Sequence, residues 1–214
     1  MKLIGVRLSP FVRKVAVALS VKGIEYEHET VLPGMMPPEF VEISPLMKIP
    51  VLQHGDLVIP DSSVICEYLE EKYPAPSLLP ETPEDRARAR FMEEYGDTRL
   101  VEVAAIPFIE NFVGPRLRQL QPNPERTKQA EEELFPPILD FLESRVPEQN
   151  FLFGSFCTVD TALVSPMVNA SIGGYEVDAI RWPRYAAYID RVKAYPPVAQ
   201  ALEIERQAMA ELLA

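Results

Sequence analysis

A proline-rich stretch at residues 74–85, PAPSLLPETPED, divides the chain into two parts with different hydrophobic patterns. Before it, apolar residues recur with a period of two in some segments and of 3.6 in others, which predicts strands mixed with helices. After it, the helical period continues almost to the end of the chain. Because clustered prolines favour loops, we predict an α/β domain at 1–75, a linker at 76–84 and an all-helical domain at 85–214.

The first part begins as a strand–helix–strand unit. KLIGVRL (2–8) and YEHETV (26–31) are typical of strands, and FVRKVAVALSVKG (11–23) is typical of a helix that ends at its glycine. Such a unit normally places its two strands parallel, with a right-handed crossover. A Pro- and Met-containing loop at 32–47, which could hold a short helix, comes next.

Two more strands and a helix complete this part. IPVLQ (49–53) and DLVIP (56–60) flank the turn signal His-Gly-Asp and predict a hairpin, and DSSVICEYLEEKYP (61–74) predicts a capped helix. The predicted order is β-α-β-α-β-β-α. In the second part we expect a long helix at 83–113 bent near Pro107, and a buried, almost uncharged helix at 158–173.

Composition limits the possible partners. The 214 residues are 47% apolar and carry a formal charge of −11, which disfavours nonspecific binding to nucleic acid or to anionic membranes. No membrane-spanning run or signal peptide is recognisable, and two cysteines, Cys66 and Cys157, cannot build a disulfide framework. We therefore expect a cytoplasmic protein. Because residues 1–75 carry only −3 of the charge, a small anion would bind there.

Ser9 lies where the first strand turns into the first helix. Serine is a preferred helix N-cap and Pro10 suits the first turn, so capping alone accounts for the pair. The same position gathers free backbone N–H groups and the positive end of the helix dipole, which stabilise an anion. A hydroxyl there can donate to a thiolate and lower the pKa of the thiol.

Two further positions admit both a structural and a functional interpretation. Pro50 precedes a strand, and a cis bond in this turn would leave the main chain of Ile49 free to pair with an extended peptide-like ligand; a trans proline on an edge strand is the plainer alternative. Asp61 and Ser62 open the next helix as caps, or bind an amine and a carboxylate, or do both.

Taken together, these motifs resemble the glutathione transferase family, in which a thioredoxin-like domain precedes an all-helical domain. SPFVRKVAVAL is similar to the first-helix motif of the serine-type members, KIPVL to their cis-proline motif, and DSSVICEYL to the motif that holds the glutamyl end of glutathione. LEEKYPAPSLLPETPEDRARARFMEEY and CTVDTALVSPM are similar to the family's linker region and its buried helix, so the resemblance covers nearly the whole chain. The resemblance is to serine-type members of the bacterial tau-, zeta- and theta-like kind.

The resemblance implies a role for each site residue. Ser9 would donate to the glutathione thiolate, and the main chain of Ile49, before Pro50, would pair with the cysteinyl backbone. Lys48 would meet the glycyl carboxylate, and Phe11 would border the site. Asp61, where the family commonly has Glu, would hold the γ-glutamyl amine, and Ser62 the carboxylate.

The activity that the resemblance implies is conjugation of glutathione, as co-substrate, to a small electrophile, as in detoxification. The resemblance also implies a homodimer that needs no metal or other cofactor. The turn reads Ser-Pro-Phe-Val and carries no cysteine, so the reactive sulfur would belong to the ligand. A glutathione-dependent peroxidase or a maleylacetoacetate-type isomerase would use the same thiolate. A noncatalytic regulator resembling the stringent starvation proteins is the alternative of another class, and it would have no use for Ser9, Lys48 and Ser62 together.

Other residues carry weaker signals. Tyr95, Phe108 and Phe112 have helical spacing and would either line the pocket for the electrophile or belong to a core or interface. Asp160 predicts a capping box in which Cys157 takes the place usual for Ser or Thr, unless Thr158 takes over with a shift of one residue. His28 and His54 have no third ligand near them in sequence, so we expect no metal site.

Overall fold

The computed structural model describes residues 1–212 and divides them into two compact units. The first, here the N-terminal unit, contains Met1–Leu79 together with Pro196–Leu212; the second, here the helical unit, contains Pro80–Tyr195. The helical unit therefore ends earlier than the predicted all-helical domain, 85–214, because Pro196–Leu212 packs with the N-terminal unit. Residues 213 and 214 lie outside the described part.

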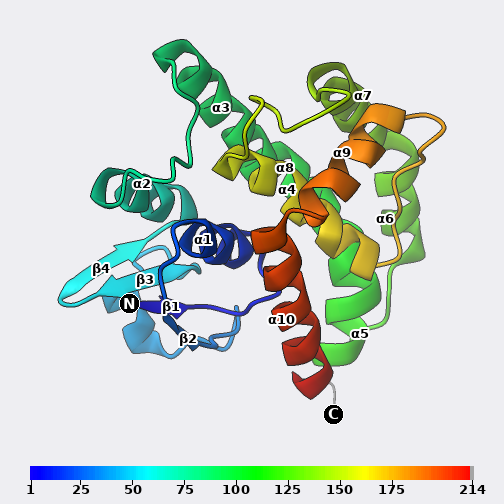
Figure 1. Cartoon of the computed structure of the whole chain (residues 1–214). Helices are drawn as coiled ribbons and strands as arrows, with labels where there is room; N and C mark the ends of the chain where they lie inside the picture. Colours follow the sequence, from blue (N-terminus) through cyan, green and yellow to red (C-terminus); the bar gives the residue numbers. More distant parts are fainter. Residues whose placement is uncertain (213–214) are drawn as a thin grey trace. The chain divides into compact units, whose positions relative to one another are not determined.

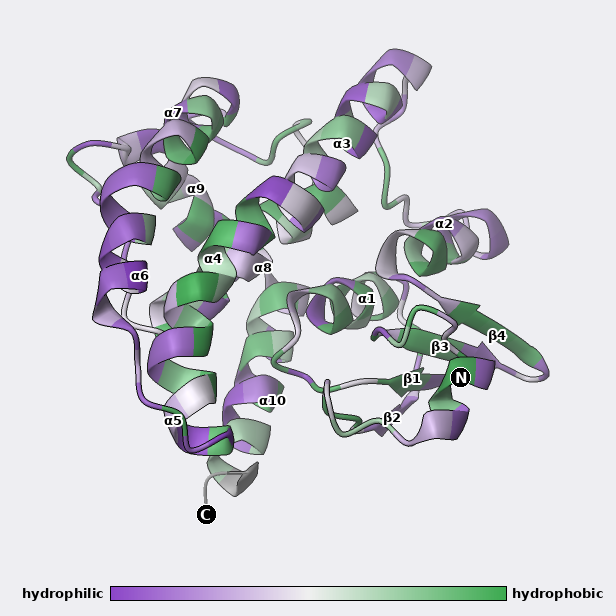
Figure 2. Ribbon diagram, turned by 180° about the vertical axis from the view of Figure 1, so that it is seen from behind, coloured by the Kyte–Doolittle hydropathy of each residue, from purple (hydrophilic) through white to green (hydrophobic). Residues whose placement is uncertain are grey.

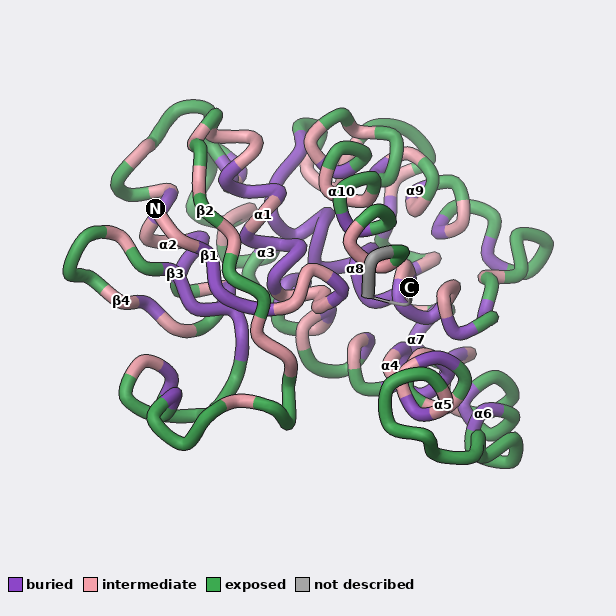
Figure 3. The backbone as a smooth tube through the Cα atoms, turned by 90° about the horizontal axis from the view of Figure 1, so that it is seen from below, coloured by how far each residue is buried: buried purple, intermediate pink, exposed green. Residues whose placement is uncertain are grey.

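A four-stranded sheet organises the N-terminal unit. Its order is β2-β1-β3-β4, with β1 (Lys2–Ile4) parallel to β2 (Glu27–Glu29) and antiparallel to β3 (Val51–His54), which in turn pairs antiparallel with β4 (Leu57–Pro60). Figure 3 shows the inner strands β1 and β3 mainly buried and the outer strands β2 and β4 more exposed. Together with its helices, this order is the thioredoxin-like arrangement expected from the sequence.

Helices α1 (Pro10–Val21) and α2 (Ser62–Lys72) pack side by side against the sheet (Figure 1). Leu3, Val15, Leu52 and Ile65 are fully buried in the core that they share, where apolar burial provides the main stabilisation. In the loop between β2 and β3, the possible helix is a 3-10 segment, η1 (Pro38–Glu42), whose Phe40 enters this core. The C-terminal helix α10 (Pro196–Leu212) lies against α1.

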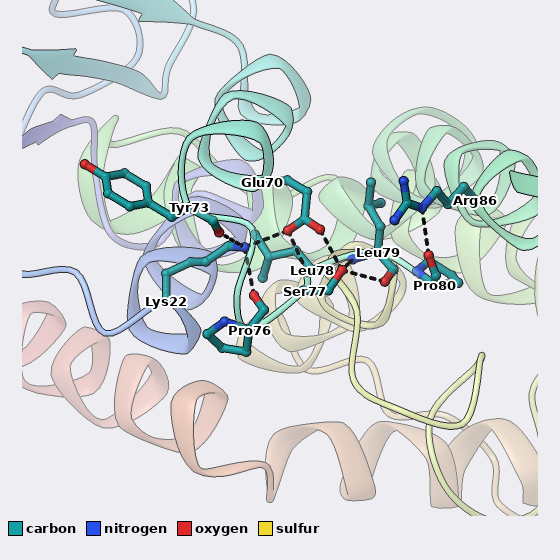
Figure 4. Close-up of polar contacts among 9 residues, drawn as sticks. All are labelled: Lys22, Glu70, Tyr73, Pro76, Ser77, Leu78, Leu79, Pro80 and Arg86. Atoms are coloured by element: carbon teal, nitrogen blue, oxygen red, sulfur yellow. Dashed lines mark hydrogen bonds and ion pairs between the residues drawn. The ribbon is translucent and has the colours of Figure 1, made fainter. Parts of the chain in front are cut away.

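The proline-rich segment is fastened to the N-terminal unit by a buried lysine (Figure 4). The Lys22 ammonium, with a fully buried side chain, donates to Glu70 Oε2 at 2.6 Å and to the carbonyl oxygens of Tyr73 at 2.5 Å and Pro76 at 2.7 Å. Burial raises the pKa of Glu70, but hydrogen bonds from Lys22, Ser77 and the Leu78 N–H outweigh it and the net pKa is lowered. Since Leu78 also enters the core, the first part of the predicted linker, residues 76–79, belongs to this unit.

The helical unit contains two long helical runs and two single helices. The first run is α3 (Pro83–Tyr95), η2 (Gly96–Leu100), α4 (Val101–Phe108), η3 (Ile109–Val113) and α5 (Gly114–Leu117), where η2 and η3 are π-helical. The second is α6 (Pro124–Gln129), η4 (Ala130–Leu134) and α7 (Phe135–Arg145). In Figure 2, α4 is mainly hydrophobic and α6 mainly hydrophilic.

Helix α8 (Thr158–Ile172) is the centre of this unit and packs against α3, η2 and α4, with α9 (Pro183–Lys193) beside it. A Cβ on Gly96 would lie 2.7 Å from the Ala162 carbonyl oxygen, so only glycine permits this approach of η2 to α8. Among residues 1–212, no helix is long and apolar enough to cross a bilayer.

The capping box of α8 is present in the register that places Cys157 at the N-cap. Asp160 Oδ2 accepts from the Cys157 N–H at 2.8 Å, and Oδ1 accepts from the Leu152 N–H at 2.9 Å and the Tyr188 hydroxyl at 2.5 Å. Burial nevertheless raises the pKa of Asp160 to about 6, against the hydrogen bonds and Arg191, which lower it. The alternative, in which the cap shifts to Thr158, does not occur.

The raised pKa predicts how Asp160 affects stability with pH. Because the folded state holds this proton more tightly than the unfolded chain, the contribution is complete below the unfolded pKa of 3.8 and is lost as pH rises through about 6. Relative to Asp160→Asn, the free energy of unfolding of the wild type should fall by about 1 kcal/mol between about pH 5 and about pH 7.

Urea unfolding monitored by the fluorescence of Trp182, which lies in the same unit, measures this difference. Glu132→Gln removes an exposed carboxylate of the same unit and serves as the charge-matched control. The raised pKa of Asp160 would be contradicted if the free energy of unfolding of the wild type, relative to that of Asp160→Asn, stayed constant or rose over this pH range.

Candidate functional site

The sheet register brings three sequence-distant loops to one end of the N-terminal unit. Ile4, the last residue of β1, pairs with Val51, the first of β3, which pairs with Pro60, the last of β4. The chain segments that follow β1, precede β3 and follow β4 therefore lie at the same end of the sheet. These segments contain Ser9, Ile49–Pro50 and Asp61–Ser62 respectively.

Ser9 is the N-cap of α1. Its Oγ accepts from the Val12 N–H at 3.4 Å, a long hydrogen bond, and its carbonyl accepts from the Arg13 N–H at 2.9 Å. The side chain is half-buried, and within residues 1–212 its hydroxyl proton has no acceptor. Since a serine hydroxyl can donate while it accepts, the cap leaves a donor available at the positive end of the α1 dipole.

The side chain of Ser44 holds the loop before β3 through two hydrogen bonds to the main chain of Lys48. The buried Ser44 Oγ donates to the Lys48 carbonyl at 2.8 Å and accepts from the Lys48 N–H at 3.1 Å. The Ile49–Pro50 peptide bond is cis. In the described chain, neither main-chain group of Ile49 has a hydrogen-bond partner, and the exposed Lys48 ammonium makes no ion pair. A main-chain donor, an acceptor and a cation are therefore available side by side.

Asp61 caps α2 from a strained backbone conformation. Its φ of 80° lies in the left-handed region, which a non-glycine residue seldom adopts and which often marks a functional site. Its Oδ1 accepts from the N–H groups of Ser63 at 2.9 Å and Val64 at 3.2 Å, while its own N–H donates to the Pro50 carbonyl at 3.3 Å. Asp61 is exposed and Ser62 is buried at the start of the helix, so capping leaves Oδ2 of the carboxylate unused.

Of the remaining candidate residues, only Phe11 belongs to the N-terminal unit. Phe11 is half-buried in the first turn of α1. Tyr95, Phe108 and Phe112 belong to the helical unit, where Tyr95 packs on Phe141 with ring centroids 4.5 Å apart.

Phe108 stacks on Phe112 with centroids 5.5 Å apart. Phe112 is only 4% exposed, so its ring has little free surface to offer a substrate. His54 Nδ1 lies 2.7 Å from the Tyr68 hydroxyl, and in the described chain no three His, Cys, Asp or Glu side chains are grouped to hold a metal ion.

Two buried cations on α1 were not recognised from the sequence. Arg13 Nε and Nη2 donate to the two carboxylate oxygens of Glu205 on α10 at 2.8 and 2.7 Å, with both side chains almost fully buried. Lys14 Nζ donates to Ser63 Oγ at 3.0 Å, next to the α2 cap. α1 is therefore tied on one side to α10 and on the other to α2. In the sequence, two adjacent cations on a helix predict a face exposed to solvent. Arg13 is buried instead, because Glu205, which lies 192 residues away in the chain, neutralises its charge.

The sheet order, the cap of α1, the cis bond before Pro50 and the capped second helix make the N-terminal unit a domain of the thioredoxin-like class. The family model described as "Glutathione S-transferase, N-terminal domain" matches residues 3–77. A probable glutathione S-transferase of Glycine max is 32% identical over 165 residues, which cover 76% of this chain and 68% of that protein. The chain belongs to the glutathione S-transferase family.

Other relatives agree with this assignment. A probable glutathione S-transferase of Solanum tuberosum is 43% identical over 95 residues, and the match covers only 44% of either chain. The crystal structure of a glutathione S-transferase from Rhodospirillum rubrum F11 has a TM-score of 0.83 at 26% identity, covering 94% of this chain and 91% of that one.

The Arg13–Glu205 pair predicts that α1 depends on α10. Glu205→Gln leaves a buried guanidinium without its counter-charge, which typically costs about 3 kcal/mol of folding free energy. Hydrogen exchange measured by mass spectrometry should show faster exchange in α1 and α10, and urea unfolding followed by circular dichroism should show the loss of stability.

Glu203→Gln is the matched control. Glu203 lies on the same helix and makes an equally short bidentate pair with Arg206, but both side chains are exposed, so we expect no measurable change. Equal effects of the two substitutions would contradict a special role for the buried pair.

Proposed function

We propose that this protein is a glutathione transferase that joins the thiolate of glutathione to a small electrophile. The observation that carries the proposal is the gathering of unused hydrogen-bonding groups and charges at one end of the sheet, on Ser9, Lys48, Ile49 and Asp61. Glutathione is a short peptide with a charge at each end, and this set of groups is complementary to it. The names of the relatives favour conjugation over peroxidase, isomerase or purely regulatory roles.

In this proposal each group binds one part of the tripeptide. The free N–H and C=O of Ile49 pair with the main chain of the cysteinyl residue, as an added strand would. Lys48 binds the glycyl carboxylate. At the other end, Asp61 Oδ2 accepts from the γ-glutamyl amine, while the Ser62 hydroxyl and the N-terminus of α2 bind the adjacent carboxylate. Phe11 packs beside the ligand at the first turn of α1.

The chemical step is a nucleophilic attack by glutathione sulfur. Ser9 donates its free O–H proton as a hydrogen bond to the thiolate, and the N-terminus of α1 adds a favourable potential, so a larger fraction of the thiol is ionised at neutral pH. The sulfur electron pair forms a bond to the electrophilic carbon, and the leaving group departs with the electrons of the broken bond. Holding both reactants together lowers the entropic cost of their encounter.

Replacing the hydroxyl tests this step. Ser9→Ala removes one charge-assisted hydrogen bond, so kcat/KM with glutathione and an aryl halide should fall by about 10- to 100-fold. The pKa of bound glutathione, followed by ultraviolet absorbance of the thiolate, should rise at the same time. Ser20→Ala, on the same helix, should change neither quantity.

Two results would overturn the proposal. The first is a wild-type protein that binds no glutathione at millimolar concentration. The second is an Ser9→Ala variant with an unchanged thiol pKa and unchanged turnover.

We further propose that the protein works in the cytoplasm as a homodimer. Its two cysteines are buried and form no disulfide bond, as suits a reducing compartment. The N-terminal unit exposes Met35, Leu46 and Met47 in the loop region between β2 and β3, with Met35 76% and Leu46 74% exposed. Exposed large apolar side chains that gather in one loop region indicate an interaction surface.

A charge at this surface should prevent dimer formation. In an interface, Leu46→Glu would bury an unpaired carboxylate, so light scattering coupled to size exclusion should show a shift from dimer to monomer. Ile180→Glu, at a side chain that is 94% exposed in the helical unit, should leave the mass unchanged. A Leu46→Glu protein that remains as dimeric as the wild type would rule out this surface.

A further inference from the structure

The chain passes between its two units at two peptide bonds, and each of these bonds ends at a proline. It leaves the N-terminal unit between Leu79 and Pro80 and returns to it between Tyr195 and Pro196. A proline ring fixes its own φ and restricts the backbone of the residue before it. Each crossing therefore has little backbone freedom of its own, and its stiffness depends on how firmly the flanking segments are held.

A buried ammonium holds the segment before the first crossing (Figure 4). All three hydrogens of the Lys22 ammonium are used. Their acceptors are the Glu70 carboxylate and the carbonyl oxygens of Tyr73 and Pro76. Because the Tyr73 carbonyl lies at the end of α2, the charge also meets the negative end of that helix dipole. These contacts compensate the cost of burying an ammonium and fix the chain at three points.

The Glu70 carboxylate extends this hold as far as the crossing. Its Oε2 accepts from the Leu78 N–H at 2.9 Å as well as from Lys22, and its Oε1 accepts from the Ser77 hydroxyl at 2.6 Å. Ser77 Oγ in turn accepts from the Leu79 N–H at 3.2 Å. With the Leu78 side chain in the core, the chain is fixed to the N-terminal unit up to the first crossing.

The helical unit holds the chain immediately after this crossing. Arg86 Nε, on α3, donates to the Pro80 carbonyl at 2.8 Å, and the Arg86 N–H donates to the Thr82 carbonyl at 2.9 Å. Thr82 Oγ1 caps α3 by accepting from the Asp85 N–H at 3.1 Å. The two held segments meet at the Leu79–Pro80 link, which is therefore the hinge of the first crossing.

The second crossing is also held on both sides. Before it, the Tyr195 ring stacks on Phe156 in the helical unit, with centroids 4.2 Å apart. After it, α10 begins at once with Pro196 and is tied to α1 by the buried pair of Glu205 with Arg13. Two short links restrict the relative movement of two bodies only while both stay short, so the hold of Lys22 on the first link has a consequence for both units.

We propose that Lys22 is a positioning residue of the transfer reaction, which it serves by keeping the first crossing short. The inference rests on the proposed function and on the electrophile pocket that the sequence assigns to the helical unit. The N-terminal unit binds glutathione, so the reaction needs both units to keep their reactants within reach of each other. Releasing Lys22 adds residues 73–79 to the hinge, and a longer hinge spreads the reactants over more arrangements.

Lys22→Met is close to lysine in length and removes its hydrogen bonds. With glutathione and an aryl halide, kcat/KM for the halide should fall by about 10-fold, mainly through KM, because the reactants lose their alignment. The dissociation constant of glutathione, measured by calorimetry, and the pKa of its bound thiol should stay as in the wild type. The reason is that Ser9 and Asp61 lie at the opposite ends of α1 and α2 from this contact.

Hydrogen exchange followed by NMR reports on the hinge directly. In the wild type the Leu78 amide donates to Glu70, which slows its exchange, and in Lys22→Met this amide should exchange faster. Arg86→Met releases the other side of the hinge. It should raise KM for the halide in the same way, without a change in glutathione binding or in the exchange of the Leu78 amide.

Two controls separate the hinge from charge and from stability. Lys72→Met makes the same change in charge at an exposed side chain of α2 and should alter none of these quantities. Leu19→Ala opens a cavity in the core next to α1, so it should lower the free energy of unfolding without raising KM for the halide.

Three results would overturn the proposal. The first is an unchanged KM for the halide in Lys22→Met and Arg86→Met, or an unchanged exchange of the Leu78 amide in Lys22→Met. The second is a Lys22→Met protein that loses glutathione affinity as strongly as it loses the halide. The third is a KM that rises in Leu19→Ala as much as in Lys22→Met.

If Lys22→Met does not fold, Arg86→Met decides by its KM for the halide. Failure of the proposed function looks different, since the wild type itself would then bind no glutathione in the calorimeter. A wild type that binds and conjugates glutathione, with variants that do so equally well, would refute the role of Lys22 alone.

Discussion

The antiparallel pairing of β1 with β3 determines where everything else in the N-terminal unit lies. It places the end of β1 beside the start of β3, and β4 repeats the relation one strand further out. A helix cap, a proline loop and a second helix cap thus come together although 52 residues separate Ser9 from Asp61 in the numbering. Since a shift in register by one residue would turn the buried Leu3 and Leu52 toward the opposite face, the core and the site are fixed by the same hydrogen bonds.

The three candidate binding positions were predictable because each has a local signal. Ser9 before Pro10, Pro50 before an apolar strand, and Asp61 at the start of a helix can all be recognised within a few residues. Their common location follows from the observed pairing of β1 with β3 and of β3 with β4. The capping box of α8 is likewise local, and so the sequence indicated Cys157 and Asp160 correctly despite the unusual cysteine.

The features that the sequence did not reveal depend on long-range contacts. Glu205 lies 192 residues from Arg13, and nothing in the amphipathic pattern of the last helix distinguishes its contact with α1 from contact with the helical unit. For the same reason the predicted all-helical domain, 85–214, includes α10, although this helix packs against α1. The aromatic residues predicted for the electrophile pocket show another limit of the sequence. Helical spacing places Tyr95, Phe108 and Phe112 on one helical run. The rings that pack against them decide how much of each side chain stays accessible to a ligand, and the spacing does not reveal those contacts.

Helix α1 connects these observations, because each of its faces has a different task. Its first turn presents the Ser9 hydroxyl, one flank is tied by Lys14 to the start of α2, and the opposite flank is tied by Arg13 to α10. An ion pair of buried groups is seldom more stabilising than apolar packing, so its benefit here lies in geometry. A bidentate contact fixes the rotation of α1 about its axis, whereas packed alanines and valines would tolerate small rotations. The rotation of α1 in turn sets the direction in which Ser9 points.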